Sequence, residues 1–357
     1  MHIQPTPRKK PQPGLLHEYA ERLVAFEYAS SPTNGIKPHT LLFIGGLGDG
    51  LGTVDYLTDI IAALEETAWS VFSPVLSSAY GGWGMSGLGK DIDEIGLCVN
   101  YIRDYKSSIE AAAKPGKIVL MGHSTGSQDV MQYISSANPR PPQPPLVRHP
   151  ILRPRIDGAI MQAPVSDRQA IQSALQEGNE RFSPGELQKI YADATARAKQ
   201  RPFETYDSLD TIVPLPVTAC IGYPETTVVS SRRFLSLVSP ESPRFPGEDD
   251  LFSSDLGEER LRKTFGMVGS RGVLGLGGKL LVLYSGRDPS VPGFVDKEGL
   301  VERWRRVTEE GERGQGVWHC ESGIIPGASH TLSGRHQVEQ RGVLVRKVMR
   351  FLSDTEL

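Results

Sequence analysis

The sequence of 357 residues has few cysteines and no long apolar run. Its three cysteines, Cys98, Cys220 and Cys320, lie far apart and match neither a disulfide framework nor the ligand spacing of a zinc site. We therefore expect a reducing, cytoplasmic location and no metal or other cofactor. No run of about 18 apolar residues occurs, so no segment predicts a helix that crosses a membrane.

An excess of charge of one sign is also missing. Lys and Arg number 39 and Asp and Glu number 42, which gives a net charge of -3. This balance argues against a nucleic-acid-binding protein, which would carry a basic surface. Residues 1–14 contain Pro and Lys but no apolar segment, so we expect a disordered tail and no secretory signal. The expected partner is a small molecule, and the oligomeric state is not readable from the sequence.

Glycine and proline are abundant, at 38 and 27 residues, and indicate many turns between short elements. Before residue 167 and after residue 270, apolar runs typical of buried strands alternate with segments of helical spacing. The expected strands are 22–28, 40–44, 70–76, 117–121, 156–162, 279–285 and 316–324, and the expected helices are 53–66, 91–105, 127–136, 300–309 and 337–353. This order predicts a mainly parallel sheet with helices on both faces.

The alternation stops for about a hundred residues in the middle of the chain. Ser183 and Glu186 flank Pro184 in a pattern typical of a helix start, which predicts a helix over 187–199. Weaker helices are expected at 232–238 and 258–268. We therefore predict a core of residues 15–166 and 271–357 with an inserted, mostly helical lid of residues 167–270. The Pro-rich stretch 139–155 is expected to be an exposed connector. The alternative is that it binds a partner protein that recognises proline-rich segments.

The expected strand 117–121 runs into Gly122-His123-Ser124-Thr125-Gly126, a G-x-S-x-G pattern. In a glycine-rich chain this pattern arises easily by chance, and an ordinary glycine turn is the alternative. Its position between a strand and a helix favours a nucleophile elbow, in which Ser124 sits in a strained conformation between two glycines. The pattern therefore predicts Ser124 as a nucleophile.

A serine nucleophile needs a base and an acid, which in this architecture follow it in the order acid, then histidine. Asp288 follows the expected strand 279–285, and its rival is Asp296, which is expected at a helix start. His330 lies in the loop before the last helix, and its rivals are His319 and His336. We predict Asp288 as the acid and His330 as the base.

A tetrahedral intermediate also needs backbone N–H donors for its oxyanion. Thr125, directly after the nucleophile, and Leu47, in the glycine-rich loop after the strand 40–44, are the expected donors, and Gly46 is expected to approach the substrate. The glycines of this loop do not have the spacing of a dinucleotide-binding or P-loop motif. Tyr80 and Trp83, in the next glycine-rich loop, are expected in the pocket wall or packed against the lid.

Four further aspartates, Asp91, Asp93, Asp129 and Asp167, fall near the ends of expected elements. They are expected to be helix caps or members of surface salt bridges.

Four segments together resemble a known family: LLFIGGLGDGL, SSAYGGWGMSGL, MGHSTGSQDVM and QAPVSDRQA. It is a fungal family of α/β hydrolases formerly labelled as a domain of unknown function, whose best-understood members are intracellular esterases that open the cyclic siderophore fusarinine C. The resemblance covers residues from about 15 to 354. It implies an α/β-hydrolase fold, a triad at Ser124, Asp288 and His330, and hydrolysis of the ester bonds joining acylated hydroxyornithine units, which releases iron inside the cell.

The same resemblance implies a cationic ligand, since each unit of such a ferric siderophore keeps a free amine. The predicted lid carries an acidic cluster, Glu248, Asp249, Asp250, Asp255, Glu258 and Glu259, which either attracts that ligand or forms a solvated loop. The alternatives to a siderophore esterase are a carboxylesterase, acyltransferase or peptidase acting on another acyl substrate, and a non-catalytic ligand-binding protein.

Overall fold

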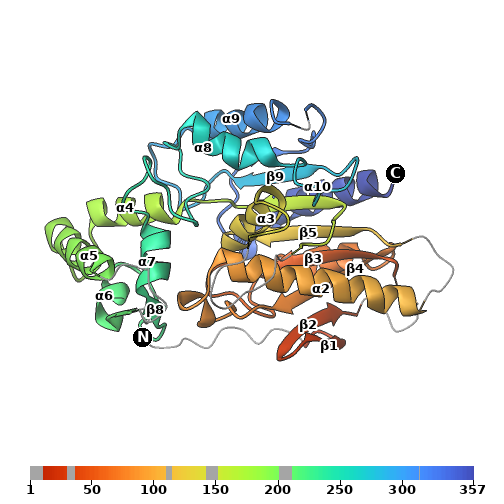
Figure 1. Cartoon of the computed structure of the whole chain (residues 1–357), viewed down its shortest axis with the longest axis horizontal. Coiled ribbons are helices and arrows are strands. Elements are labelled where there is room, and N and C mark those ends of the chain that lie inside the picture. Colours follow the sequence, from red (N-terminus) through yellow and green to blue (C-terminus); the bar gives the residue numbers. More distant parts are fainter. Residues whose placement is uncertain (1–10, 30–36, 110–114, 142–151, 201–210, 313) are drawn as a thin grey trace.

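A computed structural model describes residues 11–29, 37–109, 115–141, 152–200, 211–312 and 314–357. Figure 1 shows a central sheet with helices on both faces. Most of the predicted tail, residues 1–14, and most of the predicted connector, residues 139–155, lie outside the described residues.

The main sheet has eight strands in the order β1-β2-β4-β3-β5-β6-β9-β10. The strands are β1 (Gly14–Ala20), β2 (Leu23–Tyr28), β3 (His39–Ile44), β4 (Trp69–Val75), β5 (Ile118–His123), β6 (Gly158–Gln162), β9 (Leu280–Ser285) and β10 (Gly323–Ile325). The strands from β4 to β10 pair in parallel, and only the hairpin β1–β2 is antiparallel to its neighbours. The predicted mainly parallel sheet is confirmed. Strand β1 was not predicted, and the expected strand 316–324 shortens to β10 and an isolated bridge between Trp318 and Leu280.

Successive side chains of each strand point to opposite faces, which builds two hydrophobic cores. On β3, Leu42 and Ile44 join one core and Leu41 and Phe43 join the other. The first core is covered by α2 (Leu88–Ile109), α3 (Thr125–Ser135) and α9 (Lys297–Glu309), and the second by α1 (Leu57–Ala63) and α10 (Val338–Glu356). Both faces of the sheet are therefore buried under helices, as a parallel sheet requires.

Between β6 and β9 the chain leaves the sheet. This segment contains α4 (Asp167–Glu177), α5 (Pro184–Lys199), β7 (Ile212–Val213), α6 (Leu215–Cys220), β8 (Val229–Ser230), α7 (Ser231–Val238) and α8 (Glu258–Lys263). Helices α4 to α7 gather at one end of the sheet, on the left of Figure 1. Three short 3-10 helices complete the described elements: η1 (Gly82–Gly84), η2 (Phe265–Met267) and η3 (Arg335–Gln337).

Two different hydrophobic clusters hold this segment. Ile171, Leu187 and Phe234, from α4, α5 and α7, form a cluster of their own together with Trp83. Residues 251–274 instead pack in the first core of the sheet, where the Phe265 ring stacks on Trp304 with ring centroids 5.0 Å apart. The predicted helix start at Ser183 is confirmed, since the Glu186 carboxylate accepts from the Ser183 N–H at 2.8 Å.

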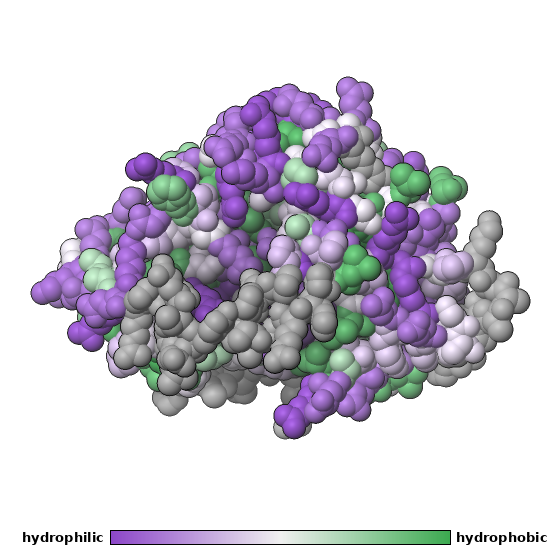
Figure 2. Space-filling model, in the orientation of Figure 1, coloured by the Kyte–Doolittle hydropathy of each residue, from purple (hydrophilic) through white to green (hydrophobic). Residues whose placement is uncertain are grey.

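The face shown in Figure 2 is mostly hydrophilic, with hydrophobic residues scattered between polar ones. In the part of the chain that the structure describes, no helix is both long and apolar enough to span a membrane.

Candidate active site

Ser124 stands at the turn between β5 and α3, with φ 53° and ψ -119°. This left-handed conformation is costly for a residue with a Cβ, and close packing of the neighbouring backbone maintains it. A Cβ on Gly122 would lie 2.0 Å from the Gly126 carbonyl oxygen, and a Cβ on Gly126 would lie 2.4 Å from the Ile44 carbonyl oxygen. The elbow therefore needs glycine on both sides of the serine.

A chain of hydrogen bonds joins Ser124 to His330 and Asp288. Ser124 Oγ lies 2.9 Å from His330 Nε2, and His330 Nδ1 lies 2.6 Å from Asp288 Oδ2. The Asp288 side chain is fully buried, and its Oδ1 accepts from the Ser290 N–H at 2.9 Å. The structure thus brings together the three residues predicted from the sequence, which come from three different strand ends.

None of the three rival residues takes part in this chain of hydrogen bonds. Asp296 is the N-cap of α9 and accepts from the Gly299 N–H at 3.0 Å, as expected of a helix start. His319 is buried and lies 3.1 Å from an Asp354 carboxylate oxygen. His336 belongs to η3.

Two backbone N–H groups beside Ser124 are free. In the described residues, neither Leu47 N–H nor Thr125 N–H donates a hydrogen bond. Thr125 opens α3, so its N–H is one of the four that a helix leaves unsatisfied. The two donors match the positions predicted for an oxyanion hole.

Asp49 holds the loop that carries Leu47, a role that the sequence reasoning missed. Its Oδ2 accepts from the Gly46 N–H at 2.8 Å, and its own N–H donates to the Gly46 carbonyl at 3.0 Å. The loop lies so close to the nucleophile that a Cβ on Gly46 would be 2.7 Å from the Ser124 Cβ. An aspartate three residues after a glycine was the available signal, since such side chains bond to nearby backbone in turns.

Tyr80 and Trp83 differ in their contacts. The Tyr80 hydroxyl accepts from the Leu51 N–H at 3.0 Å, and the Tyr80 N–H donates to the Asp49 carbonyl at 2.9 Å, so Tyr80 braces the loop of Leu47. Trp83 lines a small cavity next to Leu47 and Thr125 and also packs against Tyr223, with ring centroids 5.1 Å apart. Trp83 therefore packs against the inserted segment, and its place in the wall of a substrate pocket stays a prediction.

Gln162, at the end of β6, organises a buried polar network behind the histidine. Its Oε1 accepts from the Tyr56 hydroxyl at 3.0 Å and from His123 Nδ1 at 2.5 Å, and its Nε2 donates to Ser285 Oγ at 3.2 Å. Burial lowers the pKa of His123 to about 4. His123 is therefore neutral, and although its ring centroid lies 5.1 Å from that of His330, it brings no positive charge there. Only the position of Gln162 at a strand end could have drawn attention to it.

The acidic cluster of the sequence divides into two buried aspartates, Asp249 and Asp250, and more exposed acids that pair with cations. Asp249 binds Arg233 through both carboxylate oxygens, at 2.5 and 2.6 Å, and Asp250 binds Arg168 at 2.9 Å. Both pairs are almost fully buried. Arg168 also binds Asp255, Glu258 pairs with Arg306, and Glu259 pairs with Lys263. The buried Arg168 and Arg233 therefore contact three of the six acids, and the exposed Arg306 and Lys263 pair with two more.

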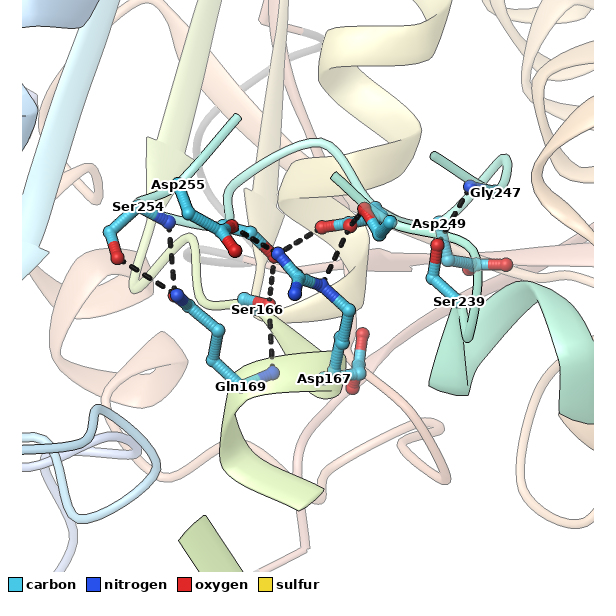
Figure 3. Close-up of polar contacts among 12 residues, drawn as sticks. Ser166, Asp167, Gln169, Ser239, Gly247, Asp249, Ser254 and Asp255 are labelled. Atoms are coloured by element: carbon cyan, nitrogen blue, oxygen red, sulfur yellow. Dashed lines mark hydrogen bonds and ion pairs between the residues drawn. The ribbon is translucent and has the colours of Figure 1, made fainter. Parts of the chain in front are cut away.

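The same region ties α4 to the loop 239–255, as Figure 3 shows. Gln169 donates to Ser254 Oγ at 2.8 Å and accepts from the Ser254 N–H at 2.9 Å. Ser166 caps α4 by accepting from the Gln169 N–H, and its hydroxyl lies 2.6 Å from that of Ser253. The start of α4 and the returning chain are thus fixed side by side.

Three of the four further aspartates depart from the expectation of caps and surface salt bridges. Asp167 accepts from Gln128 Nε2 at 2.9 Å, and the cap of α4 is Ser166. Asp91 and Asp129 are only 2% and 3% exposed, and both line the same small cavity as Arg233 of α7. Asp93 does form the expected salt bridge, with Arg140. No group of three or more His, Cys, Asp or Glu side chains that could hold a metal ion occurs among the described residues.

Comparison with known proteins places the chain in a family. The model of the family described as "Protein of unknown function (DUF1749)" matches residues 1–353. The chain is 66% identical to Esterase AN6793 of Emericella nidulans, covering 100% of this chain and 96% of that protein. It is 50% identical to fusarinine C esterase sidJ of Aspergillus fumigatus, covering 96% of each.

A solved structure extends the likeness to three dimensions. The siderophore hydrolase EstB from Aspergillus fumigatus is 48% identical and superimposes with a TM-score of 0.85, covering 97% of this chain and 98% of that one. The architecture is the predicted α/β-hydrolase fold, and the resemblance seen in the sequence is confirmed. By the family match and by these identities, the chain belongs to the DUF1749 family of α/β hydrolases.

Proposed function

We propose that the protein is a serine carboxylic ester hydrolase that opens ester bonds of a hydroxamate siderophore of the fusarinine C type. The observation that carries the proposal is the hydrogen-bonded chain Ser124–His330–Asp288 beside the free N–H groups of Leu47 and Thr125. The substrate class is supported by the relatives named fusarinine C esterase and siderophore hydrolase, at 50% and 48% identity.

In the first half of the reaction, Ser124 Oγ attacks the ester carbonyl carbon while His330 Nε2 takes the hydroxyl proton. The carbonyl oxygen becomes an oxyanion and accepts from the N–H groups of Leu47 and Thr125. Asp288 keeps the Nδ1 proton on His330 and stabilises the imidazolium. The bond from the acyl carbon to the alcohol oxygen then breaks, and His330 protonates the leaving alcohol.

In the second half, a water molecule gives a proton to His330 and attacks the acyl carbon of the Ser124 ester. The second tetrahedral intermediate breaks its bond to Ser124 Oγ, which recovers its proton from His330. The products are an alcohol and a carboxylic acid. Opening the ring of a ferric siderophore in this way weakens its hold on iron, and we propose that this releases iron in the cytoplasm.

We propose that the part of the predicted lid 167–270 that carries α4 to α7 forms the lid over this site, whereas its last residues, from 251 on, pack in the core of the sheet. The apolar cluster of α4, α5 and α7 supports this assignment, because Trp83 belongs to it and Leu47 packs against it. The segment thus contacts the loop that carries one oxyanion donor.

The test is hydrolysis of fusarinine C, with and without iron, followed by mass spectrometry and compared with simple esters and peptides. Ser124→Ala should lower turnover by roughly 10³-fold or more, whereas Ser173→Ala, on the outer part of α4, should not. A fluorophosphonate probe should label the wild type at Ser124. Ser124→Ala with most of its activity intact would remove the assignment, and an unlabelled wild type would favour a non-catalytic binding protein. Faster transfer to an added alcohol or amine than to water would favour an acyltransferase, and faster cleavage of peptides a peptidase.

A further inference from the structure

One amide side chain is buried at the end of an otherwise apolar strand. Every residue of β6 is buried, and Gln162, at its carboxyl end, carries the only polar side chain among them. Gln162 is 0% exposed. Burying an amide is costly unless its hydrogen bonds are made, and an apolar residue of the same size would avoid that cost. The glutamine therefore points to a task for its polar atoms.

The Gln162 amide uses all four of its hydrogen-bonding positions. Nε2 donates to Ser285 Oγ at 3.2 Å and, over a longer distance of 3.5 Å, to the His330 carbonyl. Oε1 accepts from the Tyr56 hydroxyl at 3.0 Å and from His123 Nδ1 at 2.5 Å. A main-chain carbonyl can only accept, so exchanging the two ends of the amide would place one carbonyl oxygen against another. The network therefore fixes the amide in a single orientation.

The main chain of the same residue supports the nucleophile. The Gln162 carbonyl accepts from the Ser124 N–H at 3.0 Å and from Ser127 Oγ at 2.9 Å. Ser285, which accepts from the amide, ends β9 three residues before Asp288. Gln162 therefore contacts each of the three segments that carry the triad, which are the nucleophile elbow, the end of the strand before the acid, and the histidine loop.

The contact with the histidine loop matters most, because few hydrogen bonds hold that loop at His330. The preceding residue is fixed by a side chain, since the Ser329 N–H donates to Gln337 Oε1 at 2.8 Å. Within the described residues, the Gln162 amide is the only hydrogen-bond partner of the His330 main chain. Without the amide N–H groups, the imidazole would lose the contact that holds its main chain against the sheet.

We infer that Gln162 is a positioning residue of the triad, whose amide N–H groups hold the His330 main chain where Nε2 meets Ser124 Oγ. Gln162 acts through His330 and does not itself take part in bond making or breaking. The precision required is high, since a misplacement of about 1 Å costs about 10²-fold in rate. This inference rests on the proposed ester hydrolysis and adds to it a residue outside the triad on which the rate depends.

Two substitutions in the full-length protein remove the amide donors and share little else. Gln162→Met keeps the length of the side chain and forms no hydrogen bond of this kind. Gln162→Glu keeps acceptor oxygens for Tyr56 and His123 but places an oxygen against the His330 carbonyl. Because Gln162→Glu retains part of the network, it provides the test even where Gln162→Met does not fold.

Both variants should lower kcat for p-nitrophenyl acetate about tenfold or more, counted per folded molecule. The KM should change by about twofold or less, because His330 serves both halves of the reaction and binds no part of the substrate. Labelling of Ser124 by a fluorophosphonate should slow together with kcat. A role in stability alone would lower the temperature of unfolding and leave kcat per folded molecule unchanged.

Gln169→Met is the matched control. Gln169 is also a buried glutamine, 4% exposed, and its amide makes two hydrogen bonds with Ser254. Among the described residues it forms no hydrogen bond with any of the three segments that carry the triad. The control should lose thermal stability and keep its kcat.

Three results would overturn the positioning role: a folded Gln162 variant with the kcat of wild type, a loss confined to KM, or an equal fall of kcat in the control. A wild type without Ser124-dependent hydrolysis of p-nitrophenyl acetate would instead refute the proposed function.

Discussion

The distance between the loop of Leu47 and the nucleophile can be tested with one methyl group. A Cβ on Gly46 would lie 2.7 Å from the Ser124 Cβ and 3.2 Å from the His123 carbonyl oxygen. Carbon atoms pack at about 3.5–4.0 Å, so Gly46→Ala requires a displacement of about 1 Å. Gly46 does not have a positive φ, so the substitution acts by contact and not by backbone strain.

A displacement of this size should separate the Leu47 N–H from the oxyanion that Ser124 creates. A misplacement of 1 Å costs about 10²-fold in rate, which corresponds to about 2.7 kcal/mol in the barrier. We therefore expect Gly46→Ala to lower kcat/KM for p-nitrophenyl acetate by about 10²-fold. Labelling of Ser124 by a fluorophosphonate should slow in parallel, since that reaction also develops charge in the same site.

The matched control is Gly185→Ala. A Cβ at Gly185 meets no atom within 4 Å, and this exposed position lies in the first turn of α5. It should keep full activity and gain up to about 1 kcal/mol in stability. Thermal unfolding separates a local displacement from a loss of folding. A folded Gly46→Ala protein with the kcat/KM and labelling rate of wild type would refute the reasoning, because the loop would then not need its observed position.

Two further variants address the buried charges. Arg168→Met should lower the free energy of unfolding by about 3–5 kcal/mol, because it leaves Asp250 buried without its cation, and adding Asp250→Leu should restore much of the loss. Urea unfolding measures the stability of the single and the double variant. An Arg168→Met protein as stable as the wild type would contradict the pairing of Arg168 with Asp250. Burial raises the pKa of Asp91, so the folded protein binds the Asp91 proton more tightly than the unfolded chain does. The protonated carboxyl therefore contributes to the stability of the fold below about pH 4. This contribution is lost as the pH rises through the raised pKa. The stability of Asp91→Asn relative to wild type should therefore increase from pH 5 to pH 8, and a difference that does not change with pH would show that the carboxyl is not perturbed.

The proximity of Ser124, Asp288 and His330 could be predicted because each residue follows the carboxyl end of an apolar strand. Parallel strands place their carboxyl ends together, so the order of the strands fixes the neighbourhood before any side chain is considered. Leu47 and Thr125 follow from the same logic, since both are backbone donors next to strand ends.

The small cavity could not be predicted, because its wall comes from distant parts of the chain. Asp129 looks like an ordinary polar residue of α3, but in the fold it lines the cavity together with Arg233 of α7, about a hundred residues later in the chain. Strand β1 was missed for a local reason. Its apolar Leu15 and Leu16 are 56% and 65% exposed, whereas His17 and Tyr19 point inward, so the hydrophobic pattern does not report the buried face.

The bonds between the start of α4 and the returning loop have a consequence for how this family can vary. Ser166 and Ser253 lie in contact, and Arg168 reaches Asp250, so the chain that departs after β6 comes back to the point of departure. An inserted segment whose two ends are bonded to each other can be lengthened, shortened or exchanged without moving the strands that precede Ser124, Asp288 and His330. We therefore expect residues 170–248 to behave as a replaceable segment, so that the corresponding segment of a relative with a different substrate could be grafted between the same two anchors.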